Sequence, residues 1–361
     1  MKPINLLIVG YMPHYRITLF NELSKKYDLT VLYVEDADDI VPEIEYKVKP
    51  WSVVRIKKFL IHQRGFFDYC KKFDVVIASG DIHWLSCCCL SLIKRRFKLI
   101  YWSIGVSADR NKPGFDTRDK WTWVKDFFSK KADALLYYSE YPIIKNKQRG
   151  YDENKMFVAN NTIDVLPVNR YNRNKTSLLF IGTLYKTKGI ITLLEAYKEV
   201  NLEKYNLPDI EIIGGGPEFE FLNGWIIKNN LRKKIHLRGA VFDKREKLKY
   251  FDKSLACISP KQAGLSVLEC MGYGVPFITE YDSITGGERF NIVHGVNGMY
   301  ITEDNTLKDI LIDISTFPDK YIDMGYQAYN YYINNRTINH MVNDIENCVN
   351  FVLKKENCDF K

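Results

Sequence analysis

The chain has 361 residues and is 46% hydrophobic, which suits two domains of ordinary size and excludes a disordered chain. Its 52 lysines and arginines exceed its 44 acidic residues and give a formal charge of +8, but no nucleic-acid-binding motif accompanies this charge, so we expect no nucleic-acid partner. The first apolar run is too short for a signal peptide, and residues 84–93 make up only about half of a membrane-spanning helix. These features favour a cytoplasmic protein.

The eight cysteines form neither a disulfide framework nor a metal-binding pattern. Cys87, Cys88 and Cys89 are adjacent in the chain, and no C-x-x-C pair recurs at zinc spacing. We expect buried, reduced thiols, as is usual in the cytosol, and no metal site.

The first half of the chain alternates short β-branched segments with amphipathic ones. The strand-like segments are residues 4–10, 28–34, 74–79, 97–103 and 133–139. This alternation is typical of βαβ units around a parallel sheet. It lapses at residues 168–176, V-N-R-Y-N-R-N-K-T, a polar stretch without periodicity.

The alternation then restarts in the second half of the chain. The strand-like segments there are residues 177–182, 210–217, 234–239, 255–260, 275–279 and 298–301. We therefore predict an α/β fold with two doubly wound domains, an N-terminal one at 1–168 and a C-terminal one at 169–334. Residues 335–361 are predicted to form a C-terminal helix that packs back on the N-terminal domain.

Four loops of the second half follow strands and have residues that suit a phosphate. The first, residues 182–189, combines a glycine turn with Lys188 at the start of a helix. The others are the glycines at 214–217, Gly239, and the turn at 264–266 before a short helix. The carboxyl ends of parallel strands meet in one crevice, where helix N-termini favour anions. An ordinary strand-to-helix connection also explains each loop taken alone.

In this order and spacing, the four loops resemble the donor-binding half of the retaining GT-B glycosyltransferases of family 4, the glycosyl transferases group 1. That family carries G-R-L-x-x-x-K-G, G-x-G-P, a glycine-ended strand, and E-G-F-G-x-x-x-x-E-A-M-A-x-G-x-P-V. The matching runs here are residues 182–189, 214–217, Gly239 and 261–276, the last of which includes L-E-C-M-G-Y-G-V-P. N-N-T-I-D at 160–164 and G-V-N-G at 295–298 are also similar to the family, whereas the first half matches it only generally.

The resemblance implies a GT-B fold, in which two Rossmann-like domains face a central cleft. It implies transfer of a sugar with retention, and without a metal or other cofactor, from a nucleotide-diphosphate sugar, with a UDP-sugar favoured. The implied acceptor is a glycan or a lipid-linked glycan of surface polysaccharide synthesis. The nucleotide base, the sugar and the linkage stay open.

The resemblance also assigns roles to single residues. The expected catalytic residues are Lys188 at the donor diphosphate, Glu269 at the ribose, and Lys261; the expected donor-binding residues are Gly182, Thr183, Gly214, Gly239, Gly264, Leu265 and Ser266. Three positions depart from the family, because Thr183 replaces an arginine, Lys261 replaces the first of two paired glutamates, and Ile104 stands near the place of a histidine common in the N-terminal domain. We hypothesise that Lys261 restores the cation lost at Thr183; an altered sugar preference is equally open.

Two loops of the first half are expected on the acceptor side of the cleft. In V-G-Y-M-P-H-Y-R, Gly10 allows a close backbone approach, and His14 and Arg16 are candidates to contact the acceptor or a phosphate. Packing of His14 beneath the turn is the alternative. His83 follows the third strand with Asp81 and is a further acceptor-side candidate; an aspartate that caps a helix beside a partly buried histidine is the alternative.

Basic residues alternate with Phe, Leu and Ile at residues 57–67 and 91–98. This pattern suits a peripheral position on the inner face of an anionic membrane, and it suits solvated helix faces equally well. Both interpretations stay open.

Three other functions compete with sugar transfer by a GT-B enzyme. Asp36 and Asp38 form a D-x-D, the metal-binding signature of the other glycosyltransferase fold, but they lie in the acidic run E-D-A-D-D, which is typical of a solvated loop. The absence of G-x-G-x-x-G after any strand argues against a nicotinamide oxidoreductase. The third alternative is a non-catalytic subunit that binds a partner transferase, because Thr183 and Lys261 are changes that a retired site would show.

Overall fold

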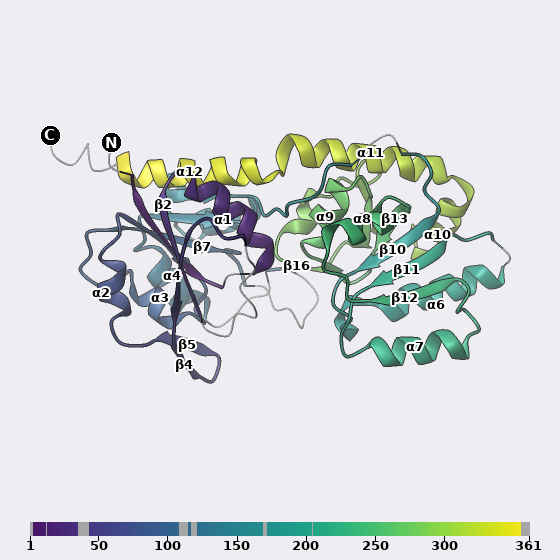
Figure 1. The fold of residues 1–361 in the computed structure, drawn as a ribbon, viewed down its shortest axis with the longest axis horizontal. Coiled ribbons are helices and arrows are strands. Elements are labelled where there is room, and N and C mark those ends of the chain that lie inside the picture. Colours follow the sequence, from purple (N-terminus) through teal and green to yellow (C-terminus); the bar gives the residue numbers. More distant parts are fainter. Residues whose placement is uncertain are drawn as a thin grey trace. The chain divides into compact units, whose positions relative to one another are not determined.

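The computed structural model describes residues 3–11, 13–34, 43–107, 115–116, 121–168, 172–203 and 205–354 (Figure 1). They form two compact units. The first contains the described parts of Met1–Ser107, Asp116–Asn161 and Ile338–Lys361, and the second contains those of Ala108–Phe115 and Thr162–Thr337. The D-x-D at residues 36–38 lies outside the described residues.

The two units meet along the chain between Asn161 and Thr162, whereas the sequence analysis set this boundary after residue 168. The side chains explain the difference. Asn161 Oδ1 accepts a hydrogen bond of 2.7 Å from Arg16 in the first unit. Residues 163–168 belong to the second unit: the Ile163 carbonyl accepts a 2.6 Å bond from the hydroxyl of Tyr332.

The first unit contains a seven-stranded parallel sheet in the order β3-β2-β1-β6-β7-β8-β9. Its strands are β1 (Asn5–Gly10), β2 (Asp28–Val34), β3 (Lys47–Trp51), β6 (Val75–Ser79), β7 (Lys98–Ser103), β8 (Ala134–Tyr137) and β9 (Met156–Val158). All five predicted strands are confirmed. Strand β3 was not predicted, because it is a partly exposed edge strand that contains Pro50, a residue that edges tolerate.

Helices cover both faces of this sheet, and a small antiparallel hairpin stands apart from it. The helices are η1 (His14–Arg16), α1 (Ile17–Ser24), α2 (Phe66–Cys70), α3 (Leu85–Cys89), α4 (Thr122–Ser129), α5 (Tyr141–Gln148), η2 (Glu153–Lys155) and α12 (Ile338–Lys354); the hairpin is β4 (Val53–Ile56) and β5 (Phe59–His62). Helix α12 lies beside α1, and its apolar residues at spacings of three and four share one core with those of α1 (Figure 1).

The second unit contains a six-stranded parallel sheet in the order β12-β11-β10-β13-β15-β17. Its strands are β10 (Ser177–Ile181), β11 (Asp209–Ile213), β12 (Ile235–Gly239), β13 (Ser254–Ile258), β15 (Phe277–Glu280) and β17 (Gly298–Ile301), with the separate pair β14 (Gln262–Ala263) and β16 (Ile284–Thr285). Its helices are η3 (Lys186–Lys188), α6 (Ile190–Leu202), α7 (Phe219–Lys228), α8 (Lys244–Phe251), α9 (Ser266–Gly272), η4 (Glu288–Asn291), α10 (Leu307–Thr316) and α11 (Pro318–Asn335).

Strand β10 shows why this sheet is covered on both faces. Leu178 and Phe180 pack into one hydrophobic core, and Leu179 and Ile181 pack into the other. Side chains alternate between the faces of a strand, so a continuous apolar run requires helices on both sides. The sequence of the strand therefore specifies the doubly wound arrangement, as predicted.

Two classes of feature are missing from the described part of the chain. None of its helices has the length and apolar character to cross a membrane. Nor do its His, Cys, Asp and Glu side chains gather in any group of three or more that could hold a metal ion.

His62 is a buried histidine in the core of the first unit. Its ring stacks on Phe66 at 4.1 Å, and its Nδ1 lies 2.7 Å from the hydroxyl of Ser86. The same hydroxyl oxygen accepts the His62 backbone N–H at 2.9 Å. Burial lowers the pKa of His62 to about 4.

We predict that His62 makes the protein less stable as the pH falls from about 6.5 to 4. In this range the unfolded chain binds a proton that the folded chain excludes, so the free energy of unfolding falls by roughly 3 kcal/mol. Urea denaturation of His62→Phe should show a flatter pH dependence over this range than the wild type. His14→Gln, which alters an exposed histidine, is the control and should keep the wild-type slope. Equal slopes for His62→Phe and the wild type would contradict this assignment.

Candidate functional site

The strand order of the second sheet locates a crevice between β10 and β13. The chain runs from β10 outward through β11 to β12 and then returns to β13 on the other side of β10. At the carboxyl edge of the sheet, the loops after β10 and β13 therefore lead away from each other and leave a crevice between them. Open α/β sheets bind ligands in such a crevice, at the point where the strand order reverses. These two loops contain Lys188 and Lys261.

Glycines bring the loops after β10 and β11 into direct backbone contact. A Cβ on Gly214 would collide with the carbonyl oxygen of Gly182, and one on Gly216 would lie 2.8 Å from the backbone of Leu184. Hydrogen bonds join the same segments: Gly182 donates to Ile213 at 2.9 Å, and Gly214 donates to Gly239 at 2.7 Å. The predicted donor-binding glycines of three strands thus form one packed backbone layer.

Lys188 lies against this layer. Its Nζ occupies the space that a Cβ on Gly182 would need, which explains the absence of a side chain there. The ammonium is half-buried, and burial lowers its pKa. Within the described part of the chain it makes no hydrogen bond or ion pair, so this cation is available to an anion.

Lys261 lies beside Lys188. Its backbone N–H donates to the carbonyl of Lys188 at 3.3 Å, and its Cγ lies 2.7 Å from the place of a Cβ on Gly189. The positive charge of Lys261 also acts on the carboxyl group of Glu280. Burial raises the pKa of this carboxyl, and Lys261 opposes that shift. The Lys261 side chain is exposed. The structure therefore brings together the two lysines that the sequence singled out.

Glu269 has a partner that the sequence analysis missed. It lies on α9 with 8% of its surface exposed, and its Oε1 accepts a 2.6 Å bond from Nζ of Lys247 on α8. Lys247 belongs to no motif and is 22 residues away in the chain, so no sequence signal pointed to it. The pair neutralises the carboxylate and fixes its position.

The other predicted donor-side residues lie around the start of α9 and the turn after β10. Gly264, Leu265 and Ser266 are half-buried, and Thr183 is exposed. Leu265 precedes α9 without any side-chain hydrogen bond to cap it. The first amides of a helix have no partner within the helix, so this turn offers donors rather than acceptors.

The predicted acceptor-side residues lie after β1 and β6, at the corresponding switch point of the first sheet. His14 is exposed and Gly10 is half-buried. His83 is 44% exposed, its Nδ1 lies 2.8 Å from Asp81, and its backbone N–H donates to the same carboxylate at 2.9 Å. Asp81 thus organises the turn before α3, but it does not cap this helix as the alternative interpretation expected, because the N-cap residue is Trp84 and no side chain caps the helix.

Arg16 has a different environment from the one predicted. It is 5% exposed and donates to Asn161, and its guanidinium lies 4.9 Å from the ring of Trp102 and 5.4 Å from that of Tyr138. These contacts all belong to the first unit. They favour a structural role over the predicted contact with an acceptor or a phosphate.

Comparisons with known proteins agree with the α/β fold with two parallel sheets. Residues 165–331 match the family model "Glycosyl transferases group 1". Similar solved structures include HepE of Anabaena in complex with UDP and glucose (14% identity, 96% of this chain and 99% of HepE covered, TM-score 0.71) and the lipopolysaccharide outer core galactosyltransferase WaaB (17%, 96% and 99%, 0.65). A third is the pneumococcal O-GlcNAc transferase GtfA in complex with UDP and GlcNAc (12%, 98% and 100%, 0.69).

No curated protein sequence matches the chain significantly. At identities this low, the solved structures establish the fold, and the family model matches the segment that carries the candidate site. The chain has the fold of the GT-B glycosyltransferases, and its residues 165–331 match the model of the glycosyl transferases group 1.

Proposed function

We propose that this chain is a glycosyltransferase that moves a sugar from a nucleotide-diphosphate sugar, with UDP as the favoured nucleotide. The observation that carries the proposal is the Lys188 ammonium, half-buried against the Gly182 turn at the switch point and without a partner in the described part of the chain. Two solved structures of the same fold, HepE and GtfA, contain UDP, which supports this choice of nucleotide.

The proposed reaction breaks the bond between the anomeric carbon and the donor diphosphate. Negative charge develops on the leaving diphosphate, and a fixed cation stabilises this charge most in the transition state. We assign Lys188 to it. A diphosphate beside Lys188 would also favour the ammonium form, against the effect of burial on its pKa. Retention of configuration and independence of a divalent metal are part of this proposal.

Two further residues complete the proposed donor site. The backbone N–H of Lys261 donates to the carbonyl of Lys188. Lys261 would therefore supply a second cation to the donor site, where Thr183 has no charge. Glu269, held by Lys247, would accept hydrogen bonds from the ribose hydroxyls with the carboxylate oxygen that faces away from Lys247. A non-catalytic subunit is the alternative, and it predicts that neither UDP nor GDP binds.

A surface of the first unit, the hairpin patch, supports a membrane-bound acceptor. We define it as Val54, Ile56, Lys57, Lys58, Trp121 and Trp123. The Lys58 ammonium lies 5.3 Å from the centre of the Trp121 ring, so the hairpin tip adjoins the start of α4. Ile56 is 54% exposed and Trp123 is 72% exposed. Exposed aromatic and aliphatic side chains among lysines suit an anionic lipid surface, and we propose that a lipid-linked glycan is the acceptor.

Lys188→Ala should weaken UDP binding about tenfold or more, because a hydrogen bond to a charged group contributes roughly 1.5–3 kcal/mol. Isothermal titration of UDP with EDTA present is the measurement. Lys186→Ala is the matched control, since Lys186 is an exposed lysine on the same turn, and it should bind UDP nearly as the wild type does. Equal affinity in the Lys188 variant and the wild type would refute the assigned role. Absence of UDP and GDP binding in the wild type would favour the non-catalytic subunit.

The paired variant Glu269→Leu with Lys247→Met should lose discrimination between UDP and its 2′-deoxy analogue. Both charges are removed together, so no buried charge is left unpaired and the domain should fold. Titration of both nucleotides into the wild type and the variant gives the ratio of affinities. A wild type that does not distinguish the two, or a variant that discriminates as well as the wild type, would rule out this ribose contact.

Trp123→Ser should reduce co-sedimentation with vesicles that contain anionic lipid, because it removes the most exposed aromatic ring of the hairpin patch. Binding of the wild type should fall as salt rises, since lysines contribute to it. Phe242→Ser is the control, because Phe242 is 87% exposed on the second unit. Equal loss in both variants would mean that the hairpin patch is not the membrane-binding surface.

A further inference from the structure

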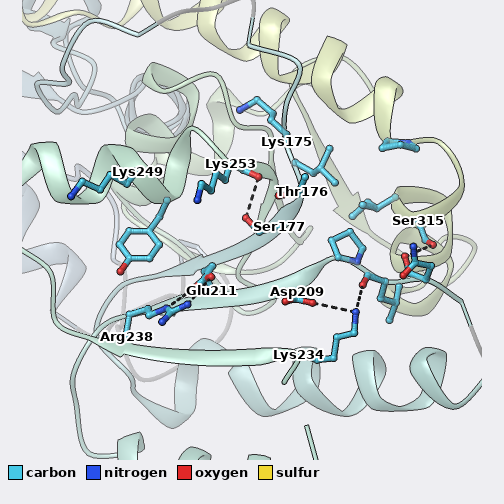
Figure 2. Close-up of a pocket in the computed structure, with 17 residues that line it drawn as sticks. Lys175, Thr176, Ser177, Asp209, Glu211, Lys234, Arg238, Lys249, Lys253 and Ser315 are labelled. Atoms are coloured by element: carbon cyan, nitrogen blue, oxygen red, sulfur yellow. Dashed lines mark hydrogen bonds and ion pairs between the residues drawn. The ribbon is translucent and has the colours of Figure 1, made fainter. Parts of the chain in front are cut away.

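Two arginines of the second unit differ in whether their guanidinium groups have an acceptor. Arg238 lines a pocket of about 810 Å³, and it donates to both carboxylate oxygens of Glu211 at 2.6 and 3.0 Å (Figure 2). Arg289, on η4, is only 8% exposed, and its buried Nη1 has no hydrogen-bond partner. A guanidinium has five N–H groups, and burying them without oxygen acceptors destabilises a protein. Arg289 is therefore a candidate to bind an anion.

The neighbours of Arg289 attract its charge without accepting its protons. The guanidinium carbon lies 5.3 Å from the centre of the Tyr281 ring and 5.4 Å from that of Phe290. A ring face attracts a cation, but it offers no oxygen to the N–H groups. The adjacent acid, Glu288, is turned away, because its Oε2 accepts the Gly286 N–H at 2.9 Å. Among the residues that the structure describes, no acid forms an ion pair with Arg289.

Backbone hydrogen bonds place Arg289 beside the segment that carries Lys261. The turn at residues 280–284 is held against this segment at both ends. Its first N–H donates to the carbonyl of Pro260 at 2.7 Å, and its last donates to the carbonyl of Lys261 at 2.9 Å. Tyr281 belongs to the same turn. The turn that packs on Arg289 is thus the one that adjoins the second cation of the proposed donor site.

The order of the strands indicates which part of the donor Arg289 would meet. The two lysines of the proposed donor site follow β10 and β13, whereas Tyr281 follows β15, the next strand of the sheet. Glu269, the proposed ribose contact, is held by Lys247 on α8, the helix between β12 and β13. This arrangement assigns the nucleoside to the β12 side and the other end of the diphosphate, which carries the sugar, to the β15 side.

We propose that the donor sugar is a uronic acid and that its carboxylate pairs with Arg289. This inference rests on the proposed function and names the substrate class of the same site. A carboxylate matches two parallel N–H groups of a guanidinium, so it would supply the acceptor that the buried Nη1 lacks among the described residues. Tyr281 is 68% exposed and covers the guanidinium from the solvent side, and rotation of its ring would open the way for the carboxylate.

The test is isothermal titration of two matched donor pairs. UDP-glucuronate differs from UDP-glucose, and UDP-galacturonate from UDP-galactose, only by a carboxylate in place of a hydroxymethyl group. The wild type should bind at least one acidic donor about tenfold more tightly than its neutral counterpart. Arg289→Met should lose this preference and still bind UDP as the wild type does. Arg232→Met, which alters an exposed arginine of the second unit, is the control and should keep the preference.

Thermal unfolding without ligand tests the state of Arg289 separately. Arg289→Met should melt no lower than the wild type, because it removes a buried charge for which the described residues provide no acceptor. A lower melting temperature, or a variant that does not fold, would mean that Arg289 has a structural partner and would overturn the proposal.

The titrations separate this inference from the proposed function. A wild type that binds UDP but prefers neither acidic donor overturns the inference alone. Weaker binding of UDP itself to Arg289→Met would assign the guanidinium to the diphosphate, which also overturns it. A wild type that does not bind UDP contradicts the proposed function, and the inference falls with it.

Discussion

The contact between the Gly182 and Gly214 backbones is the constraint on which the rest of the site depends. It requires that neither residue carries a Cβ, since a side chain on Gly214 would collide with the Gly182 carbonyl. The close approach holds the loops after β10 and β11 together, and it leaves room for the Lys188 ammonium above the turn. The position of the cation is thus determined by backbone packing in a covered parallel sheet rather than by a salt bridge.

The balance of charges at the proposed donor site favours an anionic ligand. Glu269, the buried acid of the site, is neutralised by Lys247, whereas Lys188 keeps its charge without a partner in the described residues. An unpaired, half-buried ammonium destabilises the free protein, and a ligand that pairs with it recovers that free energy.

Sequence patterns predicted the parts of the fold that depend on local chemistry. Continuous apolar runs such as the L-L-F-I of residues 178–181 predicted the buried strands, and the loops around Gly182, Gly214 and Lys188 predicted a donor site through their resemblance to a known family. Features that depend on distant contacts were not predictable. Lys247 meets Glu269 from another helix, and Arg16 is buried by Trp102 and Asn161 rather than left at a loop tip.

The most direct test of the account is hydrogen exchange of the whole protein with and without saturating UDP. We expect slower exchange at the backbone amides of residues 182–189, 214–217 and 264–269, since a bound diphosphate would cover these loops. Slower exchange confined to other segments, or no change in these three, would contradict the proposal that the carboxyl edge of the second sheet is the donor site.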